Sequence, residues 1–171
     1  VQIDFACEKS FGIRKTRGDR NRLDLDALKA GVCQQSAQFV FVAAQPVYGR
    51  LIRTQLRFNY ASALPMYAIS DIFDPAGSGN VDLDGVIFPD MPWIIDPHGL
   101  SANARDAADR LWPGRNGQLG RLHAFGYDSF RLIGELQRLR AGGSSPLPGV
   151  TGRLAMDGQG RVRRELDWAQ I

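Results

Sequence analysis

The sequence predicts an α/β fold in which a parallel sheet is flanked by helices and followed by an antiparallel β-hairpin. Six apolar residues, Phe39–Ala44, form a run that is too short to span a membrane and does not alternate with polar residues. A helical pattern separates this run from a second apolar run at 65–73, which is the order strand–helix–strand. Near the C-terminus, two strand-like segments flank Gly158-Gln159-Gly160, a composition typical of a hairpin turn.

Residues 1–38 are weakly patterned and are treated as a separate N-terminal segment, whereas residues 39–171 form the predicted α/β domain. Within the segment, residues 1–5 favour a strand, the charged residues 8–22 a loop, and residues 23–32 a loosely periodic helix. The only cysteines are Cys7 and Cys33. A disulfide between them and two unrelated thiols both remain open.

The run Phe39–Ala44 predicts an inner strand of a parallel sheet, covered on both sides. Pro46 follows where the first turn of a helix tolerates proline, because the missing N–H would have no partner there. The helix predicted over 47–60 places three apolar residues on one face and three arginines on another. A basic helix face is usually solvated surface, although it also suits an acidic partner. The apolar residues are Leu51, Ile52 and Leu56, and the arginines are Arg50, Arg53 and Arg57.

Two further strands are predicted, one at 65–73 and one at 84–93 that is ended by two prolines. If the three strands are parallel neighbours, their carboxyl ends meet at one edge of the sheet, where crevices form in such folds. Trp93 leaves two interpretations open, a side chain that covers the core and a crevice wall or docking surface. The residues expected at this edge are Gln45, Ser70, Asp71, Asp90 and Trp93.

The second half of the sequence predicts two helices and the hairpin. The first helix spans 101–112 and is expected to be capped by Ser101, and residues 113–120 break it. The second helix, 122–140, is the longest, and a linker at 141–149 leads to hairpin strands at 150–157 and 161–168. The apolar stripe of the long helix consists of Leu122, Phe125, Leu132, Ile133, Leu136 and Leu139.

Composition and motifs argue against several function classes. The net charge is only +3 and the arginines are scattered, unlike the clustered basic stripe of nucleic-acid-binding proteins. No stretch approaches the roughly 20 apolar residues of a membrane span. His98 and His123 belong to no recognisable catalytic set, and Asp82-x-Asp84-Gly85 lacks the later acidic ligand of a calcium loop. We therefore predict no catalytic residue, no metal and no cofactor.

From Phe39 to the C-terminus, five stretches occur in the order found in one family: "FVFVAAQPVYGRLIRTQLRF", "LPMYAISDIF", "LDGVIFPDMPW", "LHAFGYDSFRL" and "GVTGRLAMDGQGRVRRELDWAQ". Together they resemble the C-terminal domain of LppC/LpoA-type lipoproteins, the penicillin-binding-protein activators. "DMPW" and the terminal hairpin are the most specific of them. Residues 1–38 do not share this resemblance.

The resemblance implies part of a type I periplasmic-binding-protein-like fold, in which two α/β lobes surround a cleft. It also implies a lipoprotein on the periplasmic face of the bacterial outer membrane, anchored by a lipid outside this chain. Such proteins are not enzymes; they bind and activate a bifunctional class A penicillin-binding protein in peptidoglycan synthesis. The chain resembles only the latter half of the domain, so the helix 122–140 would lack most of its own lobe's sheet. We expect its stripe to repack or to remain exposed, and the isolated chain to be poorly stable.

Two other function classes stay open. The same fold serves solute-binding proteins, for which Ser70, Asp71, Asp90 and Tyr127 are the candidate contacts of an amino acid or a similar small ligand. An enzyme would require a nucleophile or metal that the sequence does not reveal. For the activator, the basic helix face with Arg50, Arg53 and Arg57 is the candidate docking surface.

Overall fold

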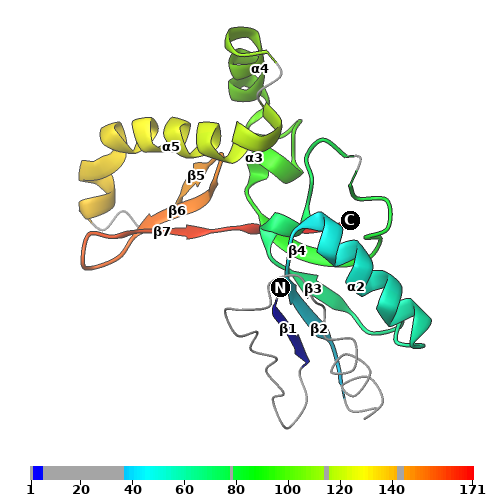
Figure 1. Cartoon of the computed structure of the whole chain (residues 1–171). Coiled ribbons are helices and arrows are strands. Elements are labelled where there is room, and N and C mark those ends of the chain that lie inside the picture. The colour runs from blue at the N-terminus through cyan, green and yellow to red at the C-terminus, as the bar shows by residue number, and fades with distance from the viewer. Residues whose placement is uncertain (1, 6–36, 78, 114–115, 142–144) are drawn as a thin grey trace, which may run out of the picture. The chain divides into compact units, whose positions relative to one another are not determined.

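The computed structural model describes residues 2–5, 37–77, 79–113, 116–141 and 145–171 (Figure 1). The two cysteines and the helix predicted over 23–32 lie outside these ranges. The chain divides into two units, Val1–Phe88 with Ala169–Ile171, and Pro89–Trp168. Each unit is described by itself.

The first unit is built on a sheet with the order β1-β2-β3-β4-β8 (Figure 1). β1 pairs antiparallel with β2, whereas β2, β3 and β4 are parallel neighbours, as predicted from their sequence order. The strand predicted at the N-terminus is thus also present. The strands are β1 (Gln2–Phe5), β2 (Val40–Ala43), β3 (Met66–Ala68), β4 (Val86–Asp90) and β8 (Asp167–Gln170).

The inner strand β2 is fully covered on only one face. Val40 and Val42 are completely buried, whereas Phe41 and Ala43, which point to the opposite face, are half-buried. The predicted cover on both sides is therefore complete on one face and only partial on the second. An unbroken apolar run does not reveal which face is the less covered one.

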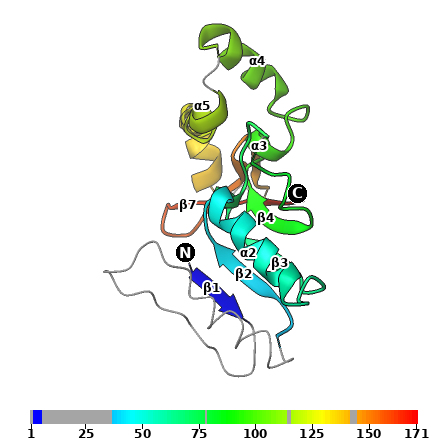
Figure 2. The ribbon, with the colours of Figure 1, turned by 45° about the vertical axis from the view of Figure 1, so that its right-hand side comes forward.

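Helix α2 (Pro46–Phe58) begins with Pro46 in its first turn, as predicted, and lies against the sheet (Figures 1 and 2). The carbonyl of Gln45 accepts the N–H groups of Tyr48 and Gly49 at 3.1 and 3.0 Å. Ile52 and Leu56 are buried, but Leu51 is exposed, so the predicted apolar face is wrong at that residue. Successive helical residues are about 100° apart, and this rotation takes Leu51 away from the face that Ile52 and Leu56 share.

The two strands that follow differ from the prediction at their ends. β3 stops at Ala68, and a 3-10 turn, η1 (Ser70–Ile72), follows it. β4 runs through Pro89, which tolerates its missing N–H because it lies beyond Ile87, the last residue paired with β3. Pro92 then starts the short helix α3 (Pro92–Ile95), so Trp93 lies in a helix and not at a strand end.

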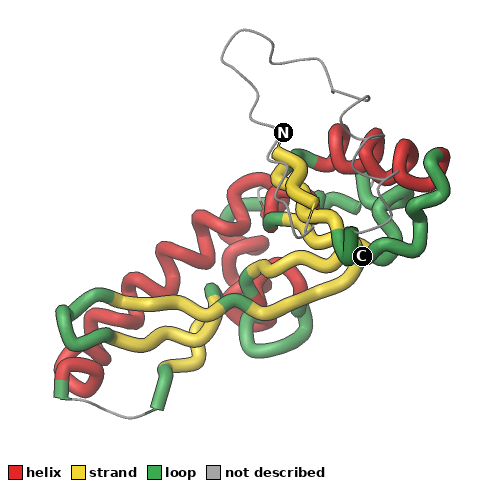
Figure 3. The backbone as a smooth tube through the Cα atoms, turned by 90° about the horizontal axis from the view of Figure 1, so that it is seen from below, coloured by secondary structure: helices red, strands yellow, loops and turns green. Residues whose placement is uncertain are grey.

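The second unit packs helices against a three-stranded antiparallel sheet with the order β5-β6-β7. Helix α5 runs alongside these strands (Figure 3). Ser101 precedes α4, but its hydroxyl donates to the carbonyl of Asp96 and does not cap the helix. The elements are α4 (Ala102–Leu111), α5 (Asn116–Arg140), β5 (Leu147–Gly149), β6 (Gly152–Met156) and β7 (Val162–Glu165).

The predicted hairpin is present as β6 and β7, whose pairing runs from Arg153↔Glu165 to Met156↔Val162. Its turn needs a glycine at Gly160, where φ is 76°. The second hairpin strand is shorter than predicted, because β7 ends at Glu165 and the residues after it form β8, which belongs to the other sheet.

Among the described residues, no helix has the length and apolar character needed to cross a membrane.

Candidate functional site

Three of the predicted cleft residues follow the parallel strands of the first unit. The pairing of Val42 with Ala68 sets the register, so Gln45 after β2 and Ser70 and Asp71 after β3 come at the same edge of the sheet. Gln45 and Asp71 are exposed and Ser70 is half-buried. Neutral amide and hydroxyl groups beside one carboxylate provide hydrogen bonds for a polar ligand.

Asp90, the last residue of β4, is buried and already bound to other groups. Its Oδ1 accepts the N–H of Met91 at 2.8 Å. Arg121 of α5 forms a bidentate pair with it, with Nη2 2.5 Å from Oδ2 and Nε 3.3 Å from Oδ1. The carboxylate thus joins the start of α5 to the end of β4, and its charge is neutralised within the chain.

Trp93 is buried in the manner of a core residue, the first of its two predicted interpretations. Gly120 of α5 lies beside the ring, and a Cβ at this position would be 3.4 Å from the indole Nε1, an ordinary van der Waals contact. The guanidinium of Arg105 lies 5.9 Å from the ring centroid and also donates to the carbonyl of Trp93. The N–H of Trp93 donates to the carbonyl of Val150 at 3.0 Å.

Tyr127 is exposed on α5, with the guanidinium of Arg131 5.9 Å from its ring. The helix predicted to start at residue 122 begins earlier, because α5 starts at Asn116, and Tyr127 lies in its middle. The glycines of the predicted break at 113–120 suggested a later start, yet Gly117 and Gly120 lie inside α5, since glycines are tolerated within a long helix.

Sequence reasoning missed Asp128, which holds the loop between β5 and β6 from a buried position. Its carboxylate accepts the N–H groups of Val150 and Thr151 at 3.1 and 2.8 Å, and the Thr151 hydroxyl at 2.6 Å. Arg131 lies 3.7 Å away on the next turn of α5. No local sequence signal links an aspartate in a helix to a loop more than 20 residues later.

The two histidines lie in different surroundings. His98 is exposed, whereas the ring of His123 lies 5.8 Å from that of Trp112. Within the part of the chain that the structure describes, no three His, Cys, Asp or Glu side chains are grouped so that they could hold a metal ion.

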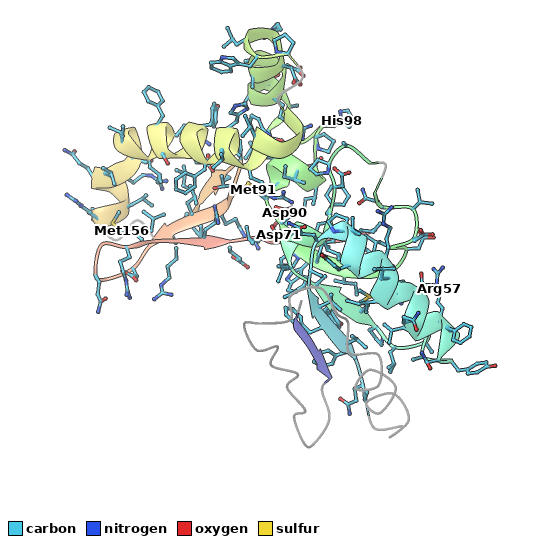
Figure 4. The ribbon with its side chains drawn as sticks, viewed as in Figure 1. Arg57, Asp71, Asp90, Met91, His98 and Met156 are labelled. Atoms are coloured by element: carbon cyan, nitrogen blue, oxygen red, sulfur yellow. The ribbon has the colours of Figure 1, made fainter. Side chains whose placement is uncertain are left out.

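The three arginines of the predicted docking surface all lie on α2. Arg57 is exposed (Figure 4), and Arg50 and Arg53 are half-buried. Arg53 donates from Nη2 to the carbonyl of Asp84 at 3.0 Å. Partial burial and the nearby positive charge of Arg57 lower the pKa of Arg53, while Asp84 raises it, and the group stays cationic at neutral pH.

The family model described as "LppC putative lipoprotein" matches residues 1–171. The chain belongs to the LppC family. The match includes residues 1–38, which the sequence motifs left outside the resemblance. It therefore extends the family assignment to the N-terminal segment.

Among curated relatives in the LppC family, the penicillin-binding protein activator LpoA of Photobacterium profundum is 42% identical over 104 residues, which cover 61% of this chain and 16% of that protein. The LpoA of Vibrio antiquarius is 29% identical over 153 residues, which cover 88% of this chain and 23% of that protein. The chain thus spans less than a quarter of these relatives.

Solved structures give the same assignment. The C-domain of LpoA from Haemophilus influenzae, described as a regulator of PBP1A, is 25% identical with a TM-score of 0.67 over 85% of this chain and 46% of that one. The leucine-binding protein LivK of Thermotoga maritima has a TM-score of 0.56 at 14% identity over 88% of this chain and 46% of that one, a likeness of fold alone. The predicted periplasmic-binding-protein-like α/β fold is confirmed.

Proposed function

We propose that this chain is part of a non-catalytic regulator that binds and activates a bifunctional class A penicillin-binding protein during peptidoglycan synthesis. The main support for this proposal is that all 171 residues match the LppC family model. Curated relatives of the chain in this family are named penicillin-binding protein activators. A solved relative described as a regulator of PBP1A gives further support.

The lipoprotein family also supports a place in the cell envelope. We propose that the protein faces the periplasm from the outer membrane and is held there by a lipid anchor outside this chain.

A reconstituted synthesis assay tests the proposal. The full natural protein that carries this sequence is mixed with a purified class A penicillin-binding protein of the same organism, and the rate of peptidoglycan synthesis from lipid-linked precursor is measured. We expect the rate to rise with the concentration of the regulator and to saturate. A synthase that neither binds the protein nor changes its rate would contradict the proposal.

A solute-binding role predicts a different result. In that case Gln45, Ser70 and Asp71 at the sheet edge would contact a small ligand. A thermal-shift screen with amino acids and peptidoglycan fragments distinguishes the two roles. A clear shift with one small ligand, together with an unaffected synthase, would favour solute binding.

A further inference from the structure

The solvent side of helix α2 carries an apolar row that the fold does not use. Val47, Leu51 and Phe58 are exposed to 56%, 50% and 81%, at positions i, i+4 and i+11. At about 100° per residue these positions share one side of the helix, roughly opposite the buried Ile52 and Leu56. Single exposed apolar residues are ordinary, but an aligned row on a helix already packed by its other face points to an interaction surface.

Tyr60 lies just beyond the end of α2. Its side chain is 97% exposed, and its backbone has φ of 59°, a left-handed conformation that is uncommon for a residue other than glycine. The turn therefore holds an aromatic ring outward. Tyrosine is enriched at protein–protein interfaces, because it combines a large apolar ring with a polar tip.

A second row, of positive charge, runs beside the apolar one. Arg50, Arg53 and Arg57 occupy positions i, i+3 and i+7, and α2 contains no acidic residue. None of the three forms an ion pair with another described residue. Like charges one turn apart on a helix repel each other, and carboxylates placed between them would relieve this repulsion.

We propose that the two rows form one docking surface, the α2 surface, for an acidic amphipathic segment of the class A penicillin-binding protein. This inference rests on the proposed function. The segment places apolar side chains against Val47, Leu51 and Phe58, and its carboxylates against the arginines. Apolar contact in the centre supplies affinity, and the charged row supplies orientation and speed of association.

The observations favour a protein segment over a lipid surface. Helices that enter a membrane interface present a wide apolar face to the lipid, whereas Ile52 and Leu56 of α2 are held in the core. What remains outside is a narrow row interrupted by Thr54, which has the width of one helix seam.

The test uses the full natural protein and the purified synthase, with the dissociation constant measured by surface plasmon resonance. One variant carries Leu51→Ser with Phe58→Ser, and another carries Arg50→Glu with Arg57→Glu. Each is expected to weaken binding at least tenfold. The matched controls are Leu100→Ser with Leu111→Ser, which are exposed apolar residues elsewhere, and Arg110→Glu with Arg140→Glu on other helices. These controls are expected to bind like the unmodified protein.

Salt dependence separates the two rows. Binding by the unmodified protein is expected to weaken as the salt concentration rises, and the arginine variant is expected to lose much of this dependence, whereas the Leu51/Phe58 variant keeps it. Circular dichroism and thermal melting show whether each variant is folded. All four substituted side chains lie outside the core, so both variants are expected to stay folded.

Three results would overturn the inference. If the unmodified protein binds the synthase and both α2 variants bind equally well, the docking surface lies elsewhere while the proposed function stands. If the variants instead lose binding to vesicles of anionic phospholipid without any change in synthase binding, α2 contacts a membrane. If the unmodified protein does not bind the synthase at all, the proposed function fails and the inference fails with it.

Discussion

Asp128 illustrates how much one buried carboxylate contributes in the second unit. It accepts two backbone N–H groups and one hydroxyl of the loop between β5 and β6. Substituting Asp128→Ala leaves these donors without partners in a buried place, and we expect a loss of roughly 3 kcal/mol in the free energy of unfolding. Chemical denaturation followed by circular dichroism measures this loss.

The control for this substitution is Asp106→Ala on α4, where the aspartate is exposed. Surface substitutions of this kind usually change stability by less than about 0.5 kcal/mol. Equal effects at both positions would show that the loop does not depend on Asp128.

Asp157 accepts the N–H groups of Gln159 and Arg161 in the hairpin turn, both at 3.0 Å. The N–H of Arg161 lowers the pKa of Asp157, helped by the Arg161 side chain, the N–H of Gln159 and the charge of Arg163, against the opposing effect of desolvation. A carboxylate with a depressed pKa contributes stability above its unfolded value, about 3.9, and loses it as the pH falls through the folded pKa.

We therefore expect the amide resonances of Gln159 and Arg161 to move together in an NMR titration, with a midpoint below about 3.9. Asp157→Asn should abolish this transition. A midpoint at or above the ordinary value would contradict the assigned hydrogen bonds.

The residues predicted for the site show what sequence can and cannot reveal at this scale. Gln45 and Asp71 come at the same edge of the sheet because parallel strands bring their carboxyl ends together, a rule that depends only on element order, and their role in a site stays a prediction. The ion pair of Asp90 with Arg121, and the clamp made by Asp128, join residues far apart in the chain. Such pairs depend on how the elements pack, and no local pattern specifies this.

At the scale of elements, α2 and η1 approach closely because Gly49 lacks a side chain. A Cβ at this position would collide with Ile72 Cδ1 and come within 3.3 Å of Leu83. Gly49→Ala should therefore destabilise the first unit by about 1–3 kcal/mol, although alanine is the better helix former. Thermal melting measures the effect.

Gly126→Ala and Gly134→Ala on α5 are the matched controls, because nothing lies within 4 Å of a Cβ at either position. At these two positions only the helix propensity changes. We therefore expect each substitution to raise the free energy of unfolding by up to about 1 kcal/mol. If Gly49→Ala also raised the free energy of unfolding, α2 would be able to move away from η1 without a loss of stability.

The elements themselves were predicted best where one signal dominates. The start of α2 follows from Pro46, and the β6–β7 turn follows from its glycines. The predictions were wrong where a segment of uniform amino-acid composition is divided between two sheets or two kinds of secondary structure. Residues 161–168 look like one strand but divide between two sheets, and the apolar run after Met66 divides into a strand and a 3-10 turn.

At the scale of the whole molecule, α5 leaves much of its apolar surface exposed. Its most exposed apolar side chains are Leu122, Phe125, Phe130 and Ile133, whereas Ala124 and Asp128 are buried. The apolar stripe was predicted either to repack on the remaining sheet or to stay exposed. In the structure, Leu122, Phe125 and Ile133 of the stripe are exposed. Leu139, by contrast, is buried.

Exposed apolar surface of this extent favours self-association. We expect the isolated 171-residue chain to unfold at low temperature or to form oligomers in size-exclusion chromatography with light scattering. Leu122→Gln with Ile133→Gln should reduce association without lowering the melting temperature, because neither side chain contributes to the core. A monomeric chain with a cooperative, high-temperature melt would contradict this expectation.

The edge strand β8 has a consequence for biosynthesis. Ile171, just after β8, exchanges hydrogen bonds with Gly85 and Val86, at 2.8 and 3.0 Å. These residues are translated more than 80 codons earlier. The nascent polypeptide can therefore assemble β1 to β4 on the ribosome. The free edge of β4 remains unpaired until β8 and residue 171 have emerged. Loss of residues 167–171 would uncover β4, an inner strand with apolar side chains.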